Sequence, residues 1–500
     1  MIDRVGRLAP LAVLCLGLVA VPSAHAPAAD TWLEVVSPNF RVVSNNGERS
    51  ARQTAWQFEQ IRAAVSQGWP WAQAPLDRPL LIVGVKDEGT MKVFAPGYFE
   101  KGQSVRYASI SASDWDRHYI MMRADLLVDG GEGVNPYRTA YWTYCDLLLS
   151  SAFHSRLPLW FTRGMAAVLS NTNVTDKEVQ VGRAVPSYID EFKSGARFPL
   201  EQLFTLTRQA PEMQREVDRR RFDAEAWALV HYMLFGEPDT AGRENRLNAL
   251  ARALTSGVPS VEAVGQIYGP LASVDTAYRR YVDRGLFRFV TMRADIQVSQ
   301  KDFTVQPVSP ASVAAIRAGY LGASRRPDDA RAAILQARQL APSDPAAYDV
   351  EGLLFEHENK LDEARAAYEK SVELKSTNFL AYVRLASLLA RTPAPDTLPT
   401  RRTLLERAVA LNPAYASSQQ ALSAVLLQMG LPKDAIEPAR RAVALAPSQV
   451  FNHTALASAL ARAGLKDDAL AEARVAMTLA TSDVERRSVQ SVIDMIDRIR

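Results

Sequence analysis

Residues 416–449 read ASSQQALSAVLLQMGLPKDAIEPARRAVALAPSQ, and this 34-residue stretch decides the fold of the C-terminal part of the chain. Pro447 stops its second helix, because a proline ring removes a backbone donor and clashes with the preceding turn. Related stretches occupy 311–344, 345–378, 379–415 and 450–483, and the third of these is three residues longer. A single helical hairpin is too small to bury its own apolar face. The repeat therefore predicts five hairpins that stack on one another.

Small residues recur at fixed positions in these copies. The eighth position holds Ala318, Gly352, Ala386, Ser423 and Ala457. The twentieth holds Ala330, Ala364, Ala435 and Ala469, with Arg401 as the exception, and a third small position holds Ala337, Ser371, Ala408, Ala442 and Ala476. Small side chains let the two helices of a hairpin approach closely. The copies resemble tetratricopeptide (TPR) repeats, which implies an all-α solenoid over 311–483, and 484–500 are expected to form a capping helix.

The resemblance to TPR repeats also implies a protein or peptide partner. Such an array presents a concave surface that is built mainly from the first helix of each hairpin. The side chains expected to line this partner groove are Asp349, Glu356, Tyr382, Val383, Gln420, Gln428, Phe451 and Thr454. A purely structural scaffold within an envelope complex stays open as an alternative.

The residues before the repeats predict an α+β unit. Strand-like patterns occupy 32–36, 40–44, 79–85, 105–113 and 118–122, and a helical pattern occupies 48–67. We expect an α+β lead-in subdomain over 30–125, a helical core over 126–290 and a linker over 291–310. Within the core, an apolar helical stripe is formed by Tyr141, Tyr144, Cys145, Leu148, Leu149 and Ala152. Further helices are expected at about 159–169, 222–235, 242–256 and 270–284.

Residues 142–146 read WTYCD inside a frame that resembles a gluzincin-like metallopeptidase domain. The frame consists of LLL at 147–149, LPLW at 157–160, Gly164 and the downstream helix at 227–233. In that family, the two histidines of HExxH and a later glutamate bind zinc, and the glutamate of HExxH is the general base.

Carried over by position, the zinc ligands and the base fall on residues that cannot replace them. The first histidine falls on Trp142, whose indole is only a donor, and the base falls on Thr143. The second histidine falls on Asp146, and the later glutamate on Arg163, a permanent cation that repels zinc. Neither 133–153 nor 155–177 contains a histidine or a glutamate, so a shifted alignment does not restore the site.

The resemblance therefore predicts a catalytically inactive zinc-peptidase-like domain without a metal or another cofactor. We expect either an ion pair between Asp146 and Arg163 in the former metal cavity, or both side chains in solvent. The alternative is a metallopeptidase or other hydrolase with a non-family site, for instance Asp146, His118 and His154 around a metal.

Other candidate residues have simpler interpretations. Cys145 lies on the apolar stripe and is expected to be a small core residue rather than a nucleophile. His154 is expected to cap a helix, and His231 to be packed and hydrogen-bonded. The Gly-rich stretch 129–133 predicts a flexible loop, since no Lys-Thr or Lys-Ser pair follows to make it a phosphate loop.

The N-terminal residues predict where the protein is located, and the net charge of the chain bears on the class of its partner. Arg4 and Arg7 precede an apolar stretch at 11–21 and the cleavage pattern Ala24-His25-Ala26, which predict a bacterial signal peptide over 1–26. We expect a periplasmic or secreted protein with no membrane span after cleavage. Cys145 would then be the one cysteine left, which allows no internal disulfide. The net charge of +3 over 500 residues does not indicate a nucleic-acid partner.

Overall fold

The computed structural model describes residues 30–69, 72, 76, 78–99, 108–126, 134–153, 157–175, 178–193, 195–236, 240–293, 298–391, 397–480 and 482–498. The predicted signal peptide, the Gly-rich loop at 129–133 and His154 lie outside these residues, and what we expect of them stays a prediction. Among the described residues, no helix combines the length and apolar character needed to cross a membrane.

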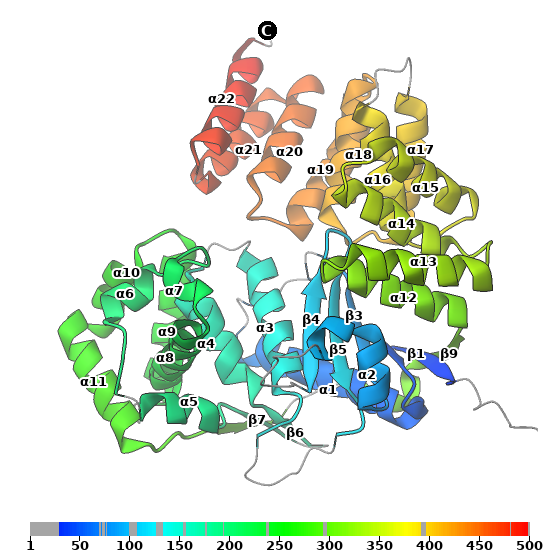
Figure 1. Cartoon of the computed structure of the whole chain (residues 1–500). Coiled ribbons are helices and arrows are strands. Elements are labelled where there is room, and N and C mark those ends of the chain that lie inside the picture. Colours follow the sequence, from blue (N-terminus) through cyan, green and yellow to red (C-terminus); the bar gives the residue numbers. More distant parts are fainter. Residues whose placement is uncertain are drawn as a thin grey trace, which may run out of the picture.

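A six-stranded mixed sheet forms the centre of the N-terminal half (Figure 1). Its strands are, in spatial order, β4 (Ser109–Ser113), β5 (His118–Arg123), β3 (Leu80–Val85), β2 (Arg41–Ser44), β1 (Trp32–Val36) and β9 (Thr304–Val308). The central strands β5, β3 and β2 are parallel, and the outer strands pair antiparallel. Each predicted strand of the lead-in is present within the described residues.

Helices surround this sheet and extend beside it as a second, helical layer (Figure 1). They are α1 (Gly47–Gly68), α2 (Glu88–Phe94), α3 (Arg138–Phe153), α4 (Leu159–Ser170), α5 (Pro186–Phe192), α6 (Leu200–Thr205), α7 (Pro211–Gln214), α8 (Glu216–Phe235), α9 (Thr240–Thr255), α10 (Ser260–Tyr268) and α11 (Leu271–Arg284). The helices predicted at 222–235, 242–256 and 270–284 correspond to α8, α9 and α11. The short helices α5, α6, α7 and α10 were not predicted, because fewer than about 11 residues show little periodicity.

The segment expected to be a linker, 291–310, instead completes both sheets of the N-terminal half. β8 (Val290–Met292) pairs with β7 (Val179–Val181), which pairs with β6 (Asn173–Val174). β9 pairs with β1 along its whole length. Pro307 is compatible with β9 because β9 is an edge strand, where a missing backbone donor breaks no ladder.

The sheet is covered on both faces, and the repeats supply part of one cover. Every side chain of β3 is buried. Leu80 and Ile82 join a large core with α1 and α3, whereas Leu81 and Val83 point to the other face, toward α2 and the first helix of the repeats. Successive strand residues alternate between the two faces. The N-terminal half and the repeats therefore share a core.

The C-terminal part is an array of helical hairpins, as the repeat predicts. Its helices are α12 (Pro310–Ala323), α13 (Pro327–Leu340), α14 (Pro345–His357), α15 (Leu361–Glu373), α16 (Phe379–Arg391), α17 (Leu398–Leu411), α18 (Ala416–Gln428), α19 (Pro432–Leu445), α20 (Val450–Arg462), α21 (Lys466–Leu479) and α22 (Asp483–Arg498). The small residues of the repeat are buried between the helices. At Gly352, for example, an added Cβ would lie 2.7 Å from the ring of Tyr368. The expected capping helix is α22, which packs on α20 and α21.

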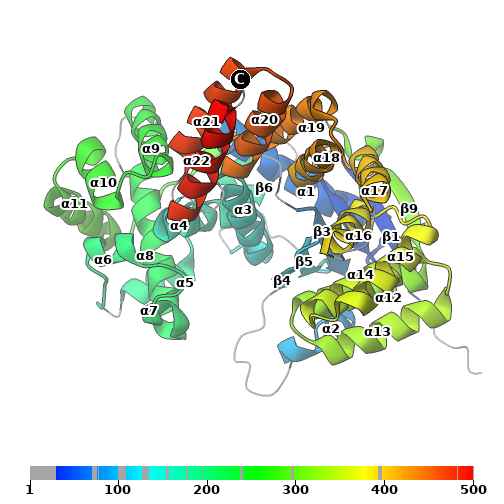
Figure 2. The same ribbon diagram turned by 90° about the horizontal axis from the view of Figure 1, so that it is seen from above.

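The hairpins follow one another along an arc above the N-terminal half (Figures 1 and 2). The first helices of the hairpins, α12, α14, α16, α18 and α20, lie on the inner side of this arc, and the second helices lie on its outer side (Figure 2). We call the first set the inner helices and the second set the outer helices. The N-terminal half lies below the array in the view of Figure 1.

Candidate functional site

Three of the four residues that the resemblance to metallopeptidases singled out, Trp142, Asp146 and Arg163, come together between α3 and α4. The guanidinium carbon of Arg163 lies 5.1 Å from the ring centre of Trp142, a cation–π arrangement. Arg163 also acts electrostatically on Asp146. Thr143 lies apart, with its hydroxyl 3.4 Å from that of Ser111 on β4.

The expected ion pair between Asp146 and Arg163 is replaced by two other pairs. Arg163 binds Asp223 of α8 through two contacts, Nε–Oδ1 at 2.6 Å and Nη2–Oδ2 at 2.8 Å. Asp146 Oδ2 instead lies 3.6 Å from Arg208 Nη2. The reason is that α4 packs closely along α8, which brings both oxygens of Asp223 to the planar guanidinium. The sequence expectation was therefore wrong about the partner, although Arg163 does fill the region with a buried ion pair.

Burial sets the electrostatics of this cluster. It raises the pKa of Asp146, and the guanidinium groups of Arg208 and Arg163 oppose that rise. It likewise raises the pKa of Asp223 against the charge of Arg163. Arg163 therefore opposes the rise in the pKa of both carboxyl groups, at Asp146 together with Arg208. Its guanidinium would repel a metal cation brought to the same place.

Close helix packing holds the cluster in place. An added Cβ on Gly164 would lie 2.5 Å from the backbone oxygen of Ala226 on α8. The glycine next to Arg163 thus allows α4 and α8 to touch, and this contact places Asp223 within reach of the guanidinium.

Cys145 and His231 are structural, as the sequence indicated. Cys145 is fully buried and free, and burial raises the pKa of its thiol, which disfavours the nucleophilic thiolate. His231 Nδ1 lies 2.7 Å from the Tyr281 hydroxyl and its Nε2 lies 2.8 Å from the Gly182 carbonyl oxygen. Burial lowers the pKa of His231 to about 4, so the ring is neutral at pH 7.

Only part of the alternative hydrolase site lies within the described residues. His118 on β5 is buried, and its Nδ1 lies 2.8 Å from the Ser113 hydroxyl. Within the described part of the chain, no three His, Cys, Asp or Glu side chains are placed to hold one metal ion. The combination of Asp146, His118 and His154 stays a prediction, since His154 is outside that part.

The β4–β5 turn (Asp114–Arg117) is seated on the inner helices of the first repeats. Asp114 Oδ1 lies 2.6 Å from Nε2 of His357 at the end of α14. The ring centre of Trp115 lies 4.1 Å from that of His357 and 4.8 Å from the guanidinium carbon of Arg384 on α16. Arg117 lines a cavity of about 320 Å³ together with Asp349 of α14. We call Asp114–Arg117 the docked turn.

Three of the residues expected in the partner groove are engaged inside the chain near the docked turn. Ser376 donates a hydrogen bond of 2.9 Å to Asp349, and burial raises the pKa of Asp349 to about 7. Arg384 Nε donates to Glu356 at 2.9 Å. Tyr382 is buried and donates to the Ser376 carbonyl oxygen at 3.0 Å. The chain itself therefore occupies this end of the groove.

The other expected groove residues extend toward α20 and are more accessible. Val383 is half-buried against the repeat core, and Thr454 is buried. Gln420 is half-buried and Gln428 is exposed. Phe451 is 51% exposed, which is unusual for an aromatic residue. We call the accessible surface of α16, α18 and α20 the open inner face.

Sequence reasoning missed the residues that pair with the predicted ones. Asp223 and Arg208 were not identified, because they lie 60 and 62 residues from Arg163 and Asp146 and no local pattern marks them. Trp115 and His357 were also missed. An aromatic residue between two aspartates, in a short turn that joins two strands, was the available signal for Trp115.

Comparisons with known proteins concern the repeats. No protein-family model matches the chain, and no curated protein matches it. Solved structures that match over the C-terminal part include YrrB, a TPR protein with an unusual peptide-binding site (17% identity, 36% of this chain and 90% of that chain, TM-score 0.32). MamA from Desulfovibrio magneticus RS-1 matches with 20% identity over 34% of this chain and 94% of that chain (TM-score 0.29). TTC0263, a TPR protein of Thermus thermophilus, matches with 23% identity over 37% of this chain and 98% of that chain (TM-score 0.27).

Proposed function

We propose that this chain is a binding protein whose open inner face holds a segment of a partner protein. One observation carries the proposal: Phe451 on the inner helix α20 is 51% exposed. An exposed aromatic side chain is a frequent anchor in protein interfaces, where burying it contributes most of the binding energy. On the neighbouring inner helix α18, Gln420 is half-buried and Gln428 is exposed, and their amide groups can donate and accept hydrogen bonds.

The position of the docked turn supports this proposal. The docked turn shows that the inner helices can hold a short segment, because Asp114 and Trp115 of that turn contact α14 and α16. Beyond α16, the capping helix α22 packs on α20, and Phe451 of α20 stays 51% exposed. The unoccupied part is thus a continuation of a surface that already binds polypeptide within this chain.

The proposal extends to the N-terminal half and to the location of the protein. The N-terminal half is a metallopeptidase-like scaffold that has lost its zinc site, with Trp142, Asp146 and Arg163 at the former ligand positions. The buried pair of Arg163 with Asp223 supports this, since it replaces metal ligation by internal ion pairing. The predicted signal peptide places the mature protein in the periplasm or outside the cell, where no zinc-dependent activity is expected of it.

Peptide display on the full chain after leader removal tests the proposed function. Peptides that bind the wild type are selected, and their affinities are measured against Phe451→Ala and against Val475→Ala. Val475 is a matched control, because it is 42% exposed on the outer helix α21. We expect Phe451→Ala to weaken binding at least tenfold and Val475→Ala to leave it unchanged. Equal loss in both variants, or in neither, contradicts a site on the open inner face.

A further inference from the structure

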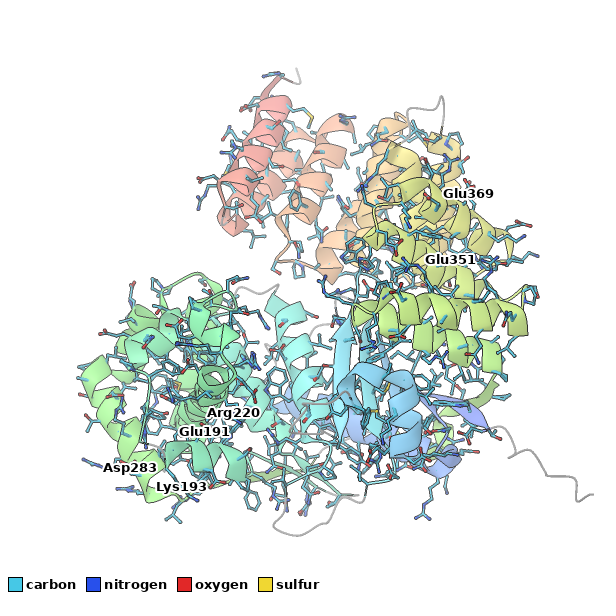
Figure 3. The ribbon with its side chains drawn as sticks, viewed as in Figure 1. Glu191, Lys193, Arg220, Asp283, Glu351 and Glu369 are labelled. Atoms are coloured by element: carbon cyan, nitrogen blue, oxygen red, sulfur yellow. The ribbon has the colours of Figure 1, made fainter. Side chains whose placement is uncertain are left out.

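Carboxylates are distributed unevenly between the inner and outer helices. The inner helices α16, α18 and α20 contain no aspartate or glutamate. The outer helices that alternate with them contain Asp362, Glu363, Glu369, Glu373, Glu406, Asp434, Glu437, Asp467, Asp468 and Glu472. Figure 3 shows one of these, Glu369, at the outer side of the array on α15. Helices α16, α18 and α20 therefore contribute no acidic side chain of their own to the open inner face. The carboxylates that reach them come from neighbouring helices, Glu356 to Arg384 and Glu472 to His453.

The covered part of the inner face shows how the array matches an occupant by charge. The inner helix α14 does carry acidic residues. Asp349 interacts electrostatically with Arg117 of the docked turn. The occupant in turn presents Asp114 to His357 of the array at 2.6 Å. Where polypeptide already lies on the inner helices, Arg117 therefore faces a carboxylate, and Asp114 faces an imidazole.

Arginines on and beside the open inner face have no such match. Arg401 Nη1 lies 3.0 Å from Oε1 of Gln428, and Arg462 Nη1 lies 3.5 Å from the backbone oxygen of Leu427. Both side chains thus reach the C-terminal end of α18, one from α17 and one from α20. Among the described residues, no carboxylate lies within ion-pair distance of Arg401, Arg462 or Arg391.

Arg401 carries a further sign of an incomplete site. It stands at the repeat position where four other copies have alanine. Its Nε atom is buried and has no hydrogen-bond partner within the described ranges. Burial lowers the pKa of Arg401. The side chain as a whole is half-buried, so an anionic group bound beside α18 would pair with the accessible part of the guanidinium.

We infer that the occupant of the open inner face is an acidic peptide segment. Its carboxylates bind Arg401 and Arg462 beside Gln428, and an apolar side chain packs on Phe451. Guanidinium groups bind carboxylates through two parallel hydrogen bonds, which gives both affinity and orientation. This inference rests on the proposed function, because it names the chemistry of the segment that the open inner face would hold.

The test uses two pools of fluorescent 12-residue peptides and the full mature chain. In the acidic pool every third residue is Asp or Glu, and in the amide pool these residues are Asn or Gln. We expect the acidic pool to bind at least tenfold more tightly at low salt, and the advantage to shrink as salt rises. Arg401→Gln and Arg462→Gln should each reduce the advantage by about tenfold. Arg441→Gln is the matched control, because Arg441 is exposed on the outer helix α19 and pairs with Glu437.

The outcomes separate this inference from the function on which it rests. If both pools bind equally and both need Phe451, the open inner face binds peptide but the acidic specificity is refuted. If neither pool binds, the proposed function fails as well. Blocking the peptide C-terminus as an amide distinguishes side-chain carboxylates from a terminal one, and either source supports the inference.

Two other occupants are tested in the same series. Stronger binding of a fluorescent 12-nucleotide DNA than of the acidic pool would overturn the peptide assignment. Sedimentation that shows a dimer lost in Arg462→Gln would identify a second copy of this chain as the occupant. Melting temperatures within about 2 °C of the wild type confirm that each variant is folded.

Discussion

Replacing Arg163 by methionine tests the ion-pair cluster that Arg163 forms with Asp223 between α4 and α8. The change keeps the length of the side chain and removes the cation that binds Asp223 through two contacts of 2.6 and 2.8 Å. The side chains of Arg163 and Asp223 are only 14% and 17% exposed. Removing one partner of a buried pair costs roughly 3–5 kcal/mol, since the other charge stays buried. The residual exposure places the expected loss at the lower end, about 3 kcal/mol.

Calorimetry of the full mature chain measures this loss as a shift of the unfolding transition. In a domain of this size, 1 kcal/mol corresponds to about 2–4 °C, so about 3 kcal/mol corresponds to roughly 6–12 °C. The loss should be smaller at pH 5 than at pH 8. Burial already raises the pKa of Asp223 and of Asp146, and without Arg163 both carboxyl groups take up protons at higher pH. Protonation removes the buried charges that destabilise the variant.

Two further variants make the Arg163 experiment decisive. Arg163→Met combined with Asp223→Leu removes both partners and should be more stable than Arg163→Met alone. Arg220→Met removes a cation from α8 whose side chain is 54% exposed, 3.6 Å from Glu191 (Figure 3), and should cost less than about 1 kcal/mol. A loss below about 1 kcal/mol for Arg163→Met, or one that is equal at pH 5 and pH 8, would refute the reasoning.

The other predictions concern packing, titration and the docked turn. Gly164→Ala should destabilise the N-terminal half by about 2 kcal/mol or more, because its Cβ would overlap the backbone of α8. The control is Gly265→Ala on α10, which has open space around it and should be neutral or slightly stabilising. Thermal unfolding of the two variants measures the difference. Burial raises the pKa of Glu225 to about 7 from an ordinary 4.5, so its contribution to stability is present below pH 4.5 and is lost as the pH rises to 7. In Glu225→Gln, the free energy of unfolding should lack this part of its pH dependence, which is on the order of 3 kcal/mol. Urea titrations of the variant and the wild type at pH 4.5 and pH 8 measure it. Equal pH dependence in both proteins would contradict the assignment. Asp114→Ala removes the 2.6 Å contact with His357. It should speed hydrogen exchange at the ends of α14 and β4 by several-fold. Unchanged exchange there would show that other contacts hold the docked turn.

The repeats could be predicted in detail because their determinants are local. Small residues such as Ala318 and Ala457 mark a helix contact within one copy, and both are fully buried as expected. The strands of the lead-in were predictable for the same reason, since alternation is visible in five or six residues. The pairing of β9 with β1 was not, because their contact between Gln306 and Glu34 spans 272 residues.

From the sequence, only the positions of the candidate site residues could be predicted, and not the residues with which they pair. The frame around 142–146 correctly identified Trp142, Asp146 and Arg163 as neighbours, since spacing along two adjacent helices determines which side chains share a face. The partner of Arg163 was not predictable, because it depends on how α8 packs on α4. In the repeats, position alone placed Asp349 and Glu356 in an open groove. Both are instead engaged by neighbouring repeat residues, Asp349 by Ser376 and Glu356 by Arg384, and position alone does not show such pairing.

Hydrogen–deuterium exchange of the full mature chain, with and without a peptide from the acidic pool, tests the central claim most directly. The account predicts slower exchange in α16, α18 and α20 when the peptide is bound, with α3, α4 and α8 unchanged. It also predicts that this protection is lost in Phe451→Ala. Protection of α3 and α4 around Trp142 and Arg163, without protection of α18 and α20, would place the binding site in the N-terminal half and contradict the account.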